Sequence, residues 1–221
     1  MNNYRKTAVI VGILFIIGTV TGILSVVFTG PIVAASDFLA QTAANNNQVT
    51  LGALLMLAMG LSLAMVPVFM YPIFKGYNKN LALGYLVFRS ALEAATYIGM
   101  TVSWILLIAL SNEYAAAGMP DSAHYQTLGR LLLGASDHIH QVTVLVFGIG
   151  ALMFYTLWYQ SRLVPRWLSV WGLIGTVLYL AAGLMSLFGQ PAEILLAVLG
   201  LNEMVLALWL IFKGFKLPTV D

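Results

Sequence analysis

The chain contains no cysteine, and only 8% of its 221 residues are Asp, Glu, Lys or Arg. The first absence excludes disulfides, thiolate metal sites and cysteine nucleophiles. The second excludes an ordinary soluble domain, because such a domain covers its surface with about a quarter charged residues. The formal charge of +2 is also too small and too dispersed to indicate nucleic-acid binding.

Apolar residues make up 61% of the chain and are grouped in six long runs. As a helix, each run is long enough to cross a hydrocarbon core of about 30 Å, whereas β-barrel strands would be about ten residues of alternating polarity. The sequence therefore predicts an all-α, polytopic transmembrane bundle of six helices in the lipid bilayer, formed as a single domain over residues 1–221. The approximate spans are 8–28, 51–74, 81–111, 131–159, 167–188 and 194–212.

The first run follows Arg5 and Lys6, as the apolar region of a secretory signal would. A signal's apolar region is about 7–15 residues long, and this run, at about 21, is long enough to span the bilayer. We therefore expect a retained first helix.

Lysine and arginine are concentrated in alternate connections, which predicts the orientation, because short cytoplasmic loops carry an excess of both. The opposite connections, including 30–50 and 112–127, hold acidic residues and His124 without Lys or Arg, and we expect them to be loops or short surface helices. Both termini are therefore expected in the cytoplasm. The basic residues on this side are Arg5, Lys6, Lys75, Lys79, Arg162, Arg166, Lys213 and Lys216.

Three ionisable residues lie near the middle of apolar runs, where an unpaired charge is costly. Counted from the inner ends of their runs, Arg89 and Glu93 lie about 12 and 18 Å deep, and Glu203 lies about 15 Å deep. The four-residue spacing of Arg89 and Glu93 lets them satisfy each other along one helix face. Alternatively, Glu203, with Asn202 beside it, faces the same cavity. The cluster then binds a cation, an amine or a proton, or locks two helices together.

A second polar cluster, Asp137-His138-Ile139-His140-Gln141, begins the fourth run. His140 is nineteen residues from Tyr159, about 28 Å along a helix, which predicts a position at the outer rim. His138 and His140 point about 200° apart on an ideal helix, so they do not easily share one ion. Asp137 and His140 share a face, but a zinc site would need His124, Asp37 or another ligand to complete it. Interfacial hydrogen bonding, pH sensing and ligand contact are the other interpretations.

No GxSxG, HExxH, Walker A or GxGxxG motif is present, and no cofactor is expected. The leading hypothesis is binding or transport of a small molecule or ion through a polar cavity lined by Arg89, Glu93, Asn202 and Glu203. The alternatives are an intramembrane metal-dependent hydrolase that uses Asp137, His140 and His124, and a structural or regulatory membrane component. The sequence leaves the ligand and the oligomeric state open.

Two segments carry a more specific pattern. They are RLVPRWLSVWGLIG at 162–175 and the Asn202-Glu203 pair that leads into WLIFKGF at 209–215. With the basic start of the first helix and the Phe88-Arg89 pair, they resemble an uncharacterised family of bacterial multi-pass membrane proteins, domain of unknown function 4386. The resemblance covers most of the chain. It implies a bacterial cytoplasmic-membrane protein, but no activity and no catalytic residues.

Overall fold

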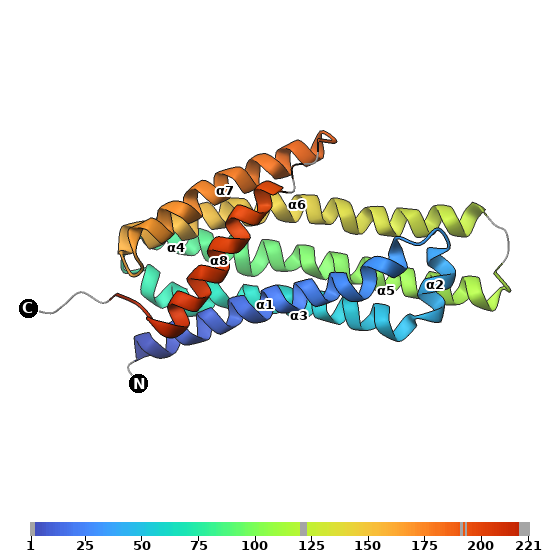
Figure 1. Cartoon of the computed structure of the whole chain (residues 1–221), viewed down its shortest axis with the longest axis horizontal. Helices are drawn as coiled ribbons and strands as arrows, with labels where there is room; N and C mark the ends of the chain where they lie inside the picture. Colours follow the sequence, from blue (N-terminus) through green and yellow to red (C-terminus); the bar gives the residue numbers. More distant parts are fainter. Residues whose placement is uncertain (1–2, 120–122, 191, 193, 217–221) are drawn as a thin grey trace, which may run out of the picture. The chain divides into compact units, whose positions relative to one another are not determined.

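The computed structural model describes residues 3–119, 123–190, 192 and 194–216, and the regular structure within these ranges is entirely helical. Pro120, Asp121 and Glu193, which belong to the connections expected on the outer side, lie outside the described residues. The helices, drawn in Figure 1, are α1 (Asn3–Val33), α2 (Phe38–Ala44), α3 (Asn46–Phe74), α4 (Lys79–Leu86), the π-helix η1 (Val87–Glu93), α5 (Ala94–Ala116), α6 (Ala123–Ser161), α7 (Arg166–Leu187) and α8 (Ile194–Phe212).

Within the described residues, six helical segments are long and apolar enough to cross a membrane. Five of them are α1, α3, α6, α7 and α8, and the sixth is the continuous run of α4, η1 and α5 over Lys79–Ala116. The all-α, six-span prediction is therefore confirmed, and the chain is a multi-pass membrane protein. The side of the membrane on which the termini lie stays a prediction.

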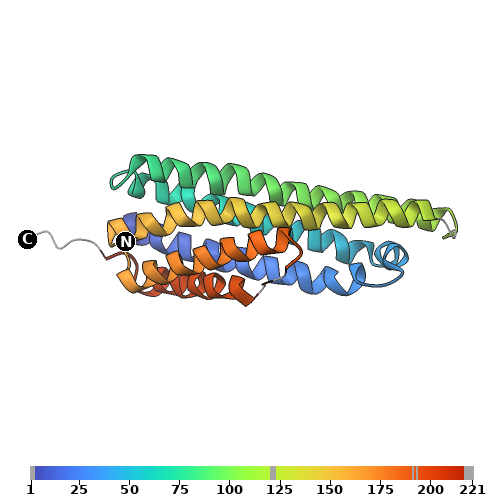
Figure 2. The same ribbon diagram turned by 90° about the horizontal axis from the view of Figure 1, so that it is seen from above.

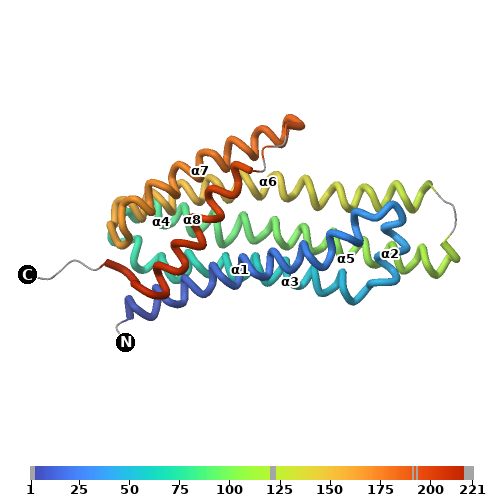
Figure 3. Tube along the Cα trace, in the orientation of Figure 1, coloured from blue at the N-terminus to red at the C-terminus, as the bar shows by residue number. Residues whose placement is uncertain are grey.

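Several helices extend beyond the apolar runs that predicted them. The expectation of a loop or surface helix at 112–127 is wrong at both ends, because α5 continues to Ala116 and α6 already begins at Ala123. A helix satisfies its own backbone N–H and C=O groups and so continues into polar sequence, while hydropathy marks only its apolar part. In the connection at 30–50 the chain reverses through the short helix α2, visible between α1 and α3 in Figure 3.

Contacts divide the chain into two compact units. Unit 1 comprises Met1–Ile17, Ser62–Ala94 and Thr143–Asp221, and unit 2 comprises Gly18–Leu61 and Ala95–Val142. Residues of α1, α3 and α6 occur in both. The two units are described separately below.

An aromatic core fills unit 1. The Phe154 ring is stacked on Tyr85, and it meets the rings of Phe74 and Trp158 edge-on. Tyr155 lies against α7 at Gly172, where a Cβ atom would come within 2.1 Å of the tyrosine ring, so only glycine permits this approach. Helices α7 and α8 pack along each other, as Figures 1 and 2 show.

The two ends of the chain meet within unit 1. The Arg5 guanidinium in the first turn of α1 donates to the carbonyl oxygens of Leu210 (3.3 Å) and Ile211 (2.6 Å) in the last turn of α8. A cation that caps free carbonyls is stabilising at the negative end of a helix. The start of α1 and the end of α8 therefore lie side by side.

Unit 2 has its own core. Trp104 packs with Val49, Ala53 and Ile32, and its indole nitrogen donates to Ser136 Oγ at 2.9 Å. This bond joins α5 to α6 and satisfies the polar atom of an otherwise apolar side chain.

Candidate functional site

The third span changes its helical geometry where its two ionisable residues lie. The seven residues Val87–Glu93 form a π-helix between α4 and α5, and both Arg89 and Glu93 belong to it. Ser90 Oγ, in the middle of this segment, donates to the carbonyl oxygen of Ala64 and so joins the π-helix to α3. π-Helical turns are rare and frequently occur at functional sites, so the backbone itself marks this position.

Arg89 lies between two carboxylates, which together with it form the ion cluster. Its NH1 atom donates to Glu93 Oε2 at 3.1 Å, and its NH2 atom lies 3.7 Å from Glu203 Oε1 on α8. The side chains of Arg89 and Glu93 are 3% and 2% exposed, whereas that of Glu203 is 18% exposed. The arginine is thus tightly paired with Glu93 and more loosely with Glu203, which is the more accessible carboxylate.

Aromatic side chains surround the ion cluster. The Arg89 guanidinium carbon lies 4.5 Å from the centre of the Phe147 ring, a cation–π geometry. Phe147 in turn meets Tyr179 edge-on at 4.9 Å. Phe147 belongs to α6 and Tyr179 to α7. The charges therefore lie among aromatic side chains contributed by α6 and α7.

The ion cluster contains one cationic and two anionic side chains. When all three are ionised it carries one surplus negative charge inside a membrane span, where an unpaired charge is costly. A bound proton or an external cation removes this surplus. Of the two carboxylates, Glu203 is the less buried and has the longer contact with Arg89.

Asn202, next to Glu203, has a structural role on one side of its amide. It is fully buried, and its Nδ2 donates to the carbonyl oxygen of Leu168 at 3.0 Å, which joins α8 to α7. Its Oδ1 has no hydrogen-bond partner among the described residues, and the same holds for Tyr155 Oη and Ser169 Oγ. Buried polar atoms of this kind commonly bind water or a ligand. Unit 1 thus offers hydrogen-bonding capacity that its own described side chains do not use.

The polar cluster on α6 is arranged differently. His138 Nδ1 is paired with Gln141 Oε1 at 3.2 Å, whereas Asp137 and His140 line a pocket with residues of α1, α3 and α5. The two further residues suggested as zinc ligands interact elsewhere: the His124 ring packs edge-on against Tyr125, and Asp37 accepts a hydrogen bond from Gln41. Among the described residues, no three His, Asp or Glu side chains are grouped closely enough to hold a metal ion.

Sequence reasoning missed the π-helix and the aromatic surroundings of the ion cluster. The spacing of Tyr85, Arg89 and Glu93 indicates one helix face, but it contains no signal for the wider turn. Phe147 and Tyr179 are single aromatic residues in apolar runs, and nothing in their local sequence distinguishes them from residues that only pack.

The family model for a domain of unknown function, DUF4386, matches residues 10–214. No curated protein and no solved structure matches the chain. Because the family match extends over nearly the whole sequence and includes all three members of the ion cluster, the chain belongs to the DUF4386 family.

Proposed function

We propose that this multi-pass member of the DUF4386 family binds and transports a proton or a small cation, and that Glu203 is the carboxylate that binds it. The observation that carries the proposal is the surplus carboxylate at Arg89. Two glutamates share one guanidinium inside the spans, and the looser of the two contacts belongs to Glu203.

In this mechanism the Arg89–Glu93 pair is a fixed element. Its 3.1 Å hydrogen bond and near-complete burial hold the guanidinium in place beside Glu203. The positive charge keeps Glu203 able to release a bound proton or cation, because it stabilises the ionised carboxylate. The Glu203 side chain therefore alternates between a loaded form and an ion-paired form.

Two buried polar atoms of unit 1 offer further sites for bound water. Tyr155 Oη and Asn202 Oδ1 are buried and have no hydrogen-bond partner among the described residues. Both belong to unit 1, as Glu203 does. Bound water at these atoms would support proton or cation movement.

The test measures competition between protons and cations on purified protein in weakly buffered detergent. Addition of NaCl, KCl or ethylammonium chloride is followed with a pH dye, and binding at Glu203 releases about one proton per chain. We expect the release to be lost in Glu203→Gln and retained in Glu113→Gln. The control Glu113 is an exposed carboxylate in the last turns of α5.

Proteoliposomes then distinguish transport from binding alone. With a trapped pH dye, the wild-type protein should acidify or alkalinise the lumen when an inward cation or proton gradient is imposed, and Glu203→Gln should not. A Glu203→Gln protein that is folded and transports normally would overturn the proposal. If Glu203→Gln unfolds at the temperature where wild-type protein is stable, Glu203 is a structural lock instead.

The proposed orientation puts both termini in the bacterial cytoplasm, on the asymmetry of the basic connections. An alkaline-phosphatase fusion after Asn78, between α3 and α4, should be inactive in this orientation. A fusion after Gly118, past the end of α5, should be active. The reverse result would overturn the orientation.

A further inference from the structure

Unit 2 contains a pocket that shares no residue with the ion cluster. Its volume is ≈ 560 Å³, and it is bounded by α1, α3, α5 and α6. Small-molecule sites usually enclose about 300–1,000 Å³ and combine mostly apolar walls with a few placed polar groups. This pocket has that composition, since its described lining is mostly apolar and aromatic and includes the polar residues Ser25, Ser136, Asp137 and His140.

Methionine and tryptophan form much of the apolar wall. Met56, Met59 and Met100 line it together with Trp104. Methionine side chains are flexible and polarisable, so they adapt to apolar ligands of different shape. The Trp104 indole is fixed by its bond to Ser136 and provides one rigid side. The wall therefore fits a hydrophobic body without selecting one exact shape.

The α1 side of the pocket includes apolar residues of the kind that a membrane protein exposes to lipid. Ile23, Val26 and Val27 line the pocket and are 59%, 63% and 60% exposed. Since α1 is a membrane-spanning candidate, the bilayer is the source from which a ligand reaches this side. The occupant must therefore partition into lipid.

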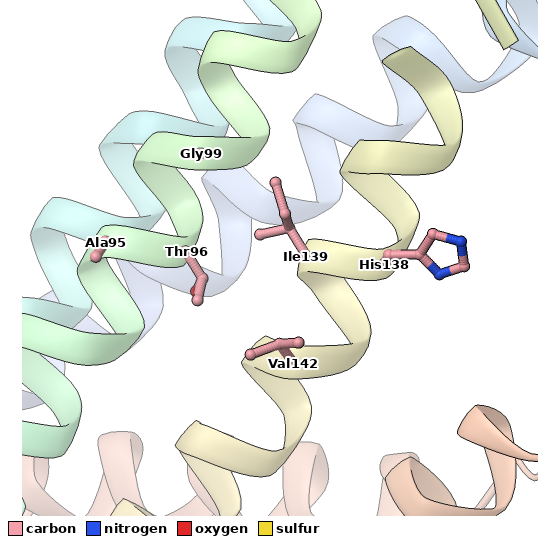
Figure 4. A pocket seen from close by; sticks show the side chains of 6 residues that line it. All are labelled: Ala95, Thr96, Gly99, His138, Ile139 and Val142. Atoms are coloured by element: carbon pink, nitrogen blue, oxygen red, sulfur yellow. The ribbon is translucent and has the colours of Figure 1, made fainter. Parts of the chain in front are cut away.

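The polar wall is provided by α6. Asp137 and His140 lie three residues apart on one face and both line the pocket. Within the part of the chain that the structure describes, no Lys or Arg forms an ion pair with Asp137. His138 does not line this pocket but a separate one, together with Ala95, Thr96 and Gly99 of α5 (Figure 4). Asp137 is thus the acidic group of this pocket.

The geometry points to a binding site for a lipophilic amine that reaches the pocket from the bilayer. Its apolar body lies against the methionines and Trp104, and its protonated amine donates to the Asp137 carboxylate with His140 beside it. A lipophilic acid is repelled by the same carboxylate, and a lipophilic alcohol donates a hydrogen bond to it without the attraction between two opposite charges. The site is independent of ion binding at Glu203.

The experiment uses the full chain in phosphatidylcholine nanodiscs, with a photoreactive dodecylamine as the probe. We expect saturable labelling that maps by mass spectrometry to Gly22–Val27, Met56–Met59 and Tyr97–Trp104. Unlabelled dodecylamine should compete, whereas dodecanol and dodecanoate of the same chain length should compete about ten-fold less well. Equal competition by dodecanol, or labelling distributed evenly over the lipid-facing helices, would overturn the proposal.

Two variants test the two ends of the ligand. Asp137→Asn should weaken dodecylamine competition about ten-fold, and Asp37→Asn, the same change at a carboxylate outside the pocket, should not.

Val26→Trp fills the α1 side and should abolish saturable labelling. Val102→Trp, a similar change at an exposed α5 residue that does not line the pocket, should leave it intact. Normal labelling in Val26→Trp, with a melting temperature equal to wild type, would overturn the pocket as the site. Loss of Glu203 function leaves all these outcomes unchanged.

Discussion

The ion cluster of unit 1 and the Asp137/His140 wall of unit 2 look alike in sequence and differ in structure. Each places a carboxylate and a basic side chain three or four residues apart on one helix. Arg89 and Glu93 are bonded at 3.1 Å and almost fully buried. Asp137 and His140 are exposed and face a pocket. Helical spacing brings side chains to one face, but the neighbouring helices decide whether that face becomes a closed ion pair or an open binding wall.

The sharpest test of the closed cluster is the replacement Arg89→Ala, for which we expect the largest effect. It leaves two buried carboxylates without their shared cation, which typically costs about 3–5 kcal/mol. The melting temperature in detergent should fall strongly. The double variant Arg89→Leu with Glu93→Leu should be more stable than Arg89→Ala, because it removes both Arg89 and Glu93 and leaves neither of them as an unpaired charge. If the stability losses at Arg89 and Glu93 were independent and additive, the two residues would not act as a pair.

The two glutamates of the ion cluster should differ from each other. Glu93→Gln removes the negative charge that strengthens a buried hydrogen bond from Arg89 and should cost about 1.5–3 kcal/mol. Glu203→Gln removes a 3.7 Å contact of a less buried side chain and also the surplus negative charge, so we expect a change of about 1 kcal/mol at most. Thermal unfolding of both variants under one set of conditions measures the difference. A larger loss for Glu203→Gln would make Glu203 the structural partner of Arg89 and Glu93 the exchangeable one.

The sequence predicted the membrane spans because hydropathy records the solvent around each helix. It also predicted the pairing of Arg89 with Glu93, because their spacing is local. The position of Glu203 next to Arg89 depends on how α8 packs, and only the depth of both residues suggested it. The aromatic side chains near the cluster carry no local signal, since a ring that covers a guanidinium and a ring that fills a core occur in the same apolar sequence.

For the polar cluster on α6, the sequence predicted how the histidines are directed but not the pocket that one of them lines. Sequence geometry separated His138 from His140, and the structure agrees, since His138 pairs with Gln141 and His140 faces the pocket. The pocket itself could not be predicted, because its walls come from four helices. The hydrophobic pattern of a single helix does not show how that helix packs against the other three. Residues such as Met56 and Val26 are identifiable as pocket residues only after the helices are packed.

The loss of a charge at Asp137 should be tolerated, whereas the loss of the charge at Arg89 in the ion cluster is not. Asp137 is exposed and has no ion pair with any Lys or Arg among the described residues. Asp137→Asn should therefore change the stability by about 0.5 kcal/mol or less, as surface substitutions usually do. Thermal unfolding in lipid-free detergent checks this. If Asp137→Asn lost as much stability as Arg89→Ala, Asp137 would be a structural charge. The two regions would then not differ in this respect.

The smallest expected effect is the response of the open wall to metal, for which we expect none. Zinc sites need three or four firm ligands, and Asp137 and His140 supply two. His138 is paired with Gln141, and His124 packs against Tyr125. Elemental analysis of protein purified without chelator should find no stoichiometric zinc, and added zinc should not raise the melting temperature, because a bound metal would stabilise the folded state. His140→Ala is the matched control: about one zinc per chain in the wild type that disappears in this variant would establish a metal centre here. The hydrolase interpretation would then replace the amine site, and the open wall would become the catalytic region of the protein.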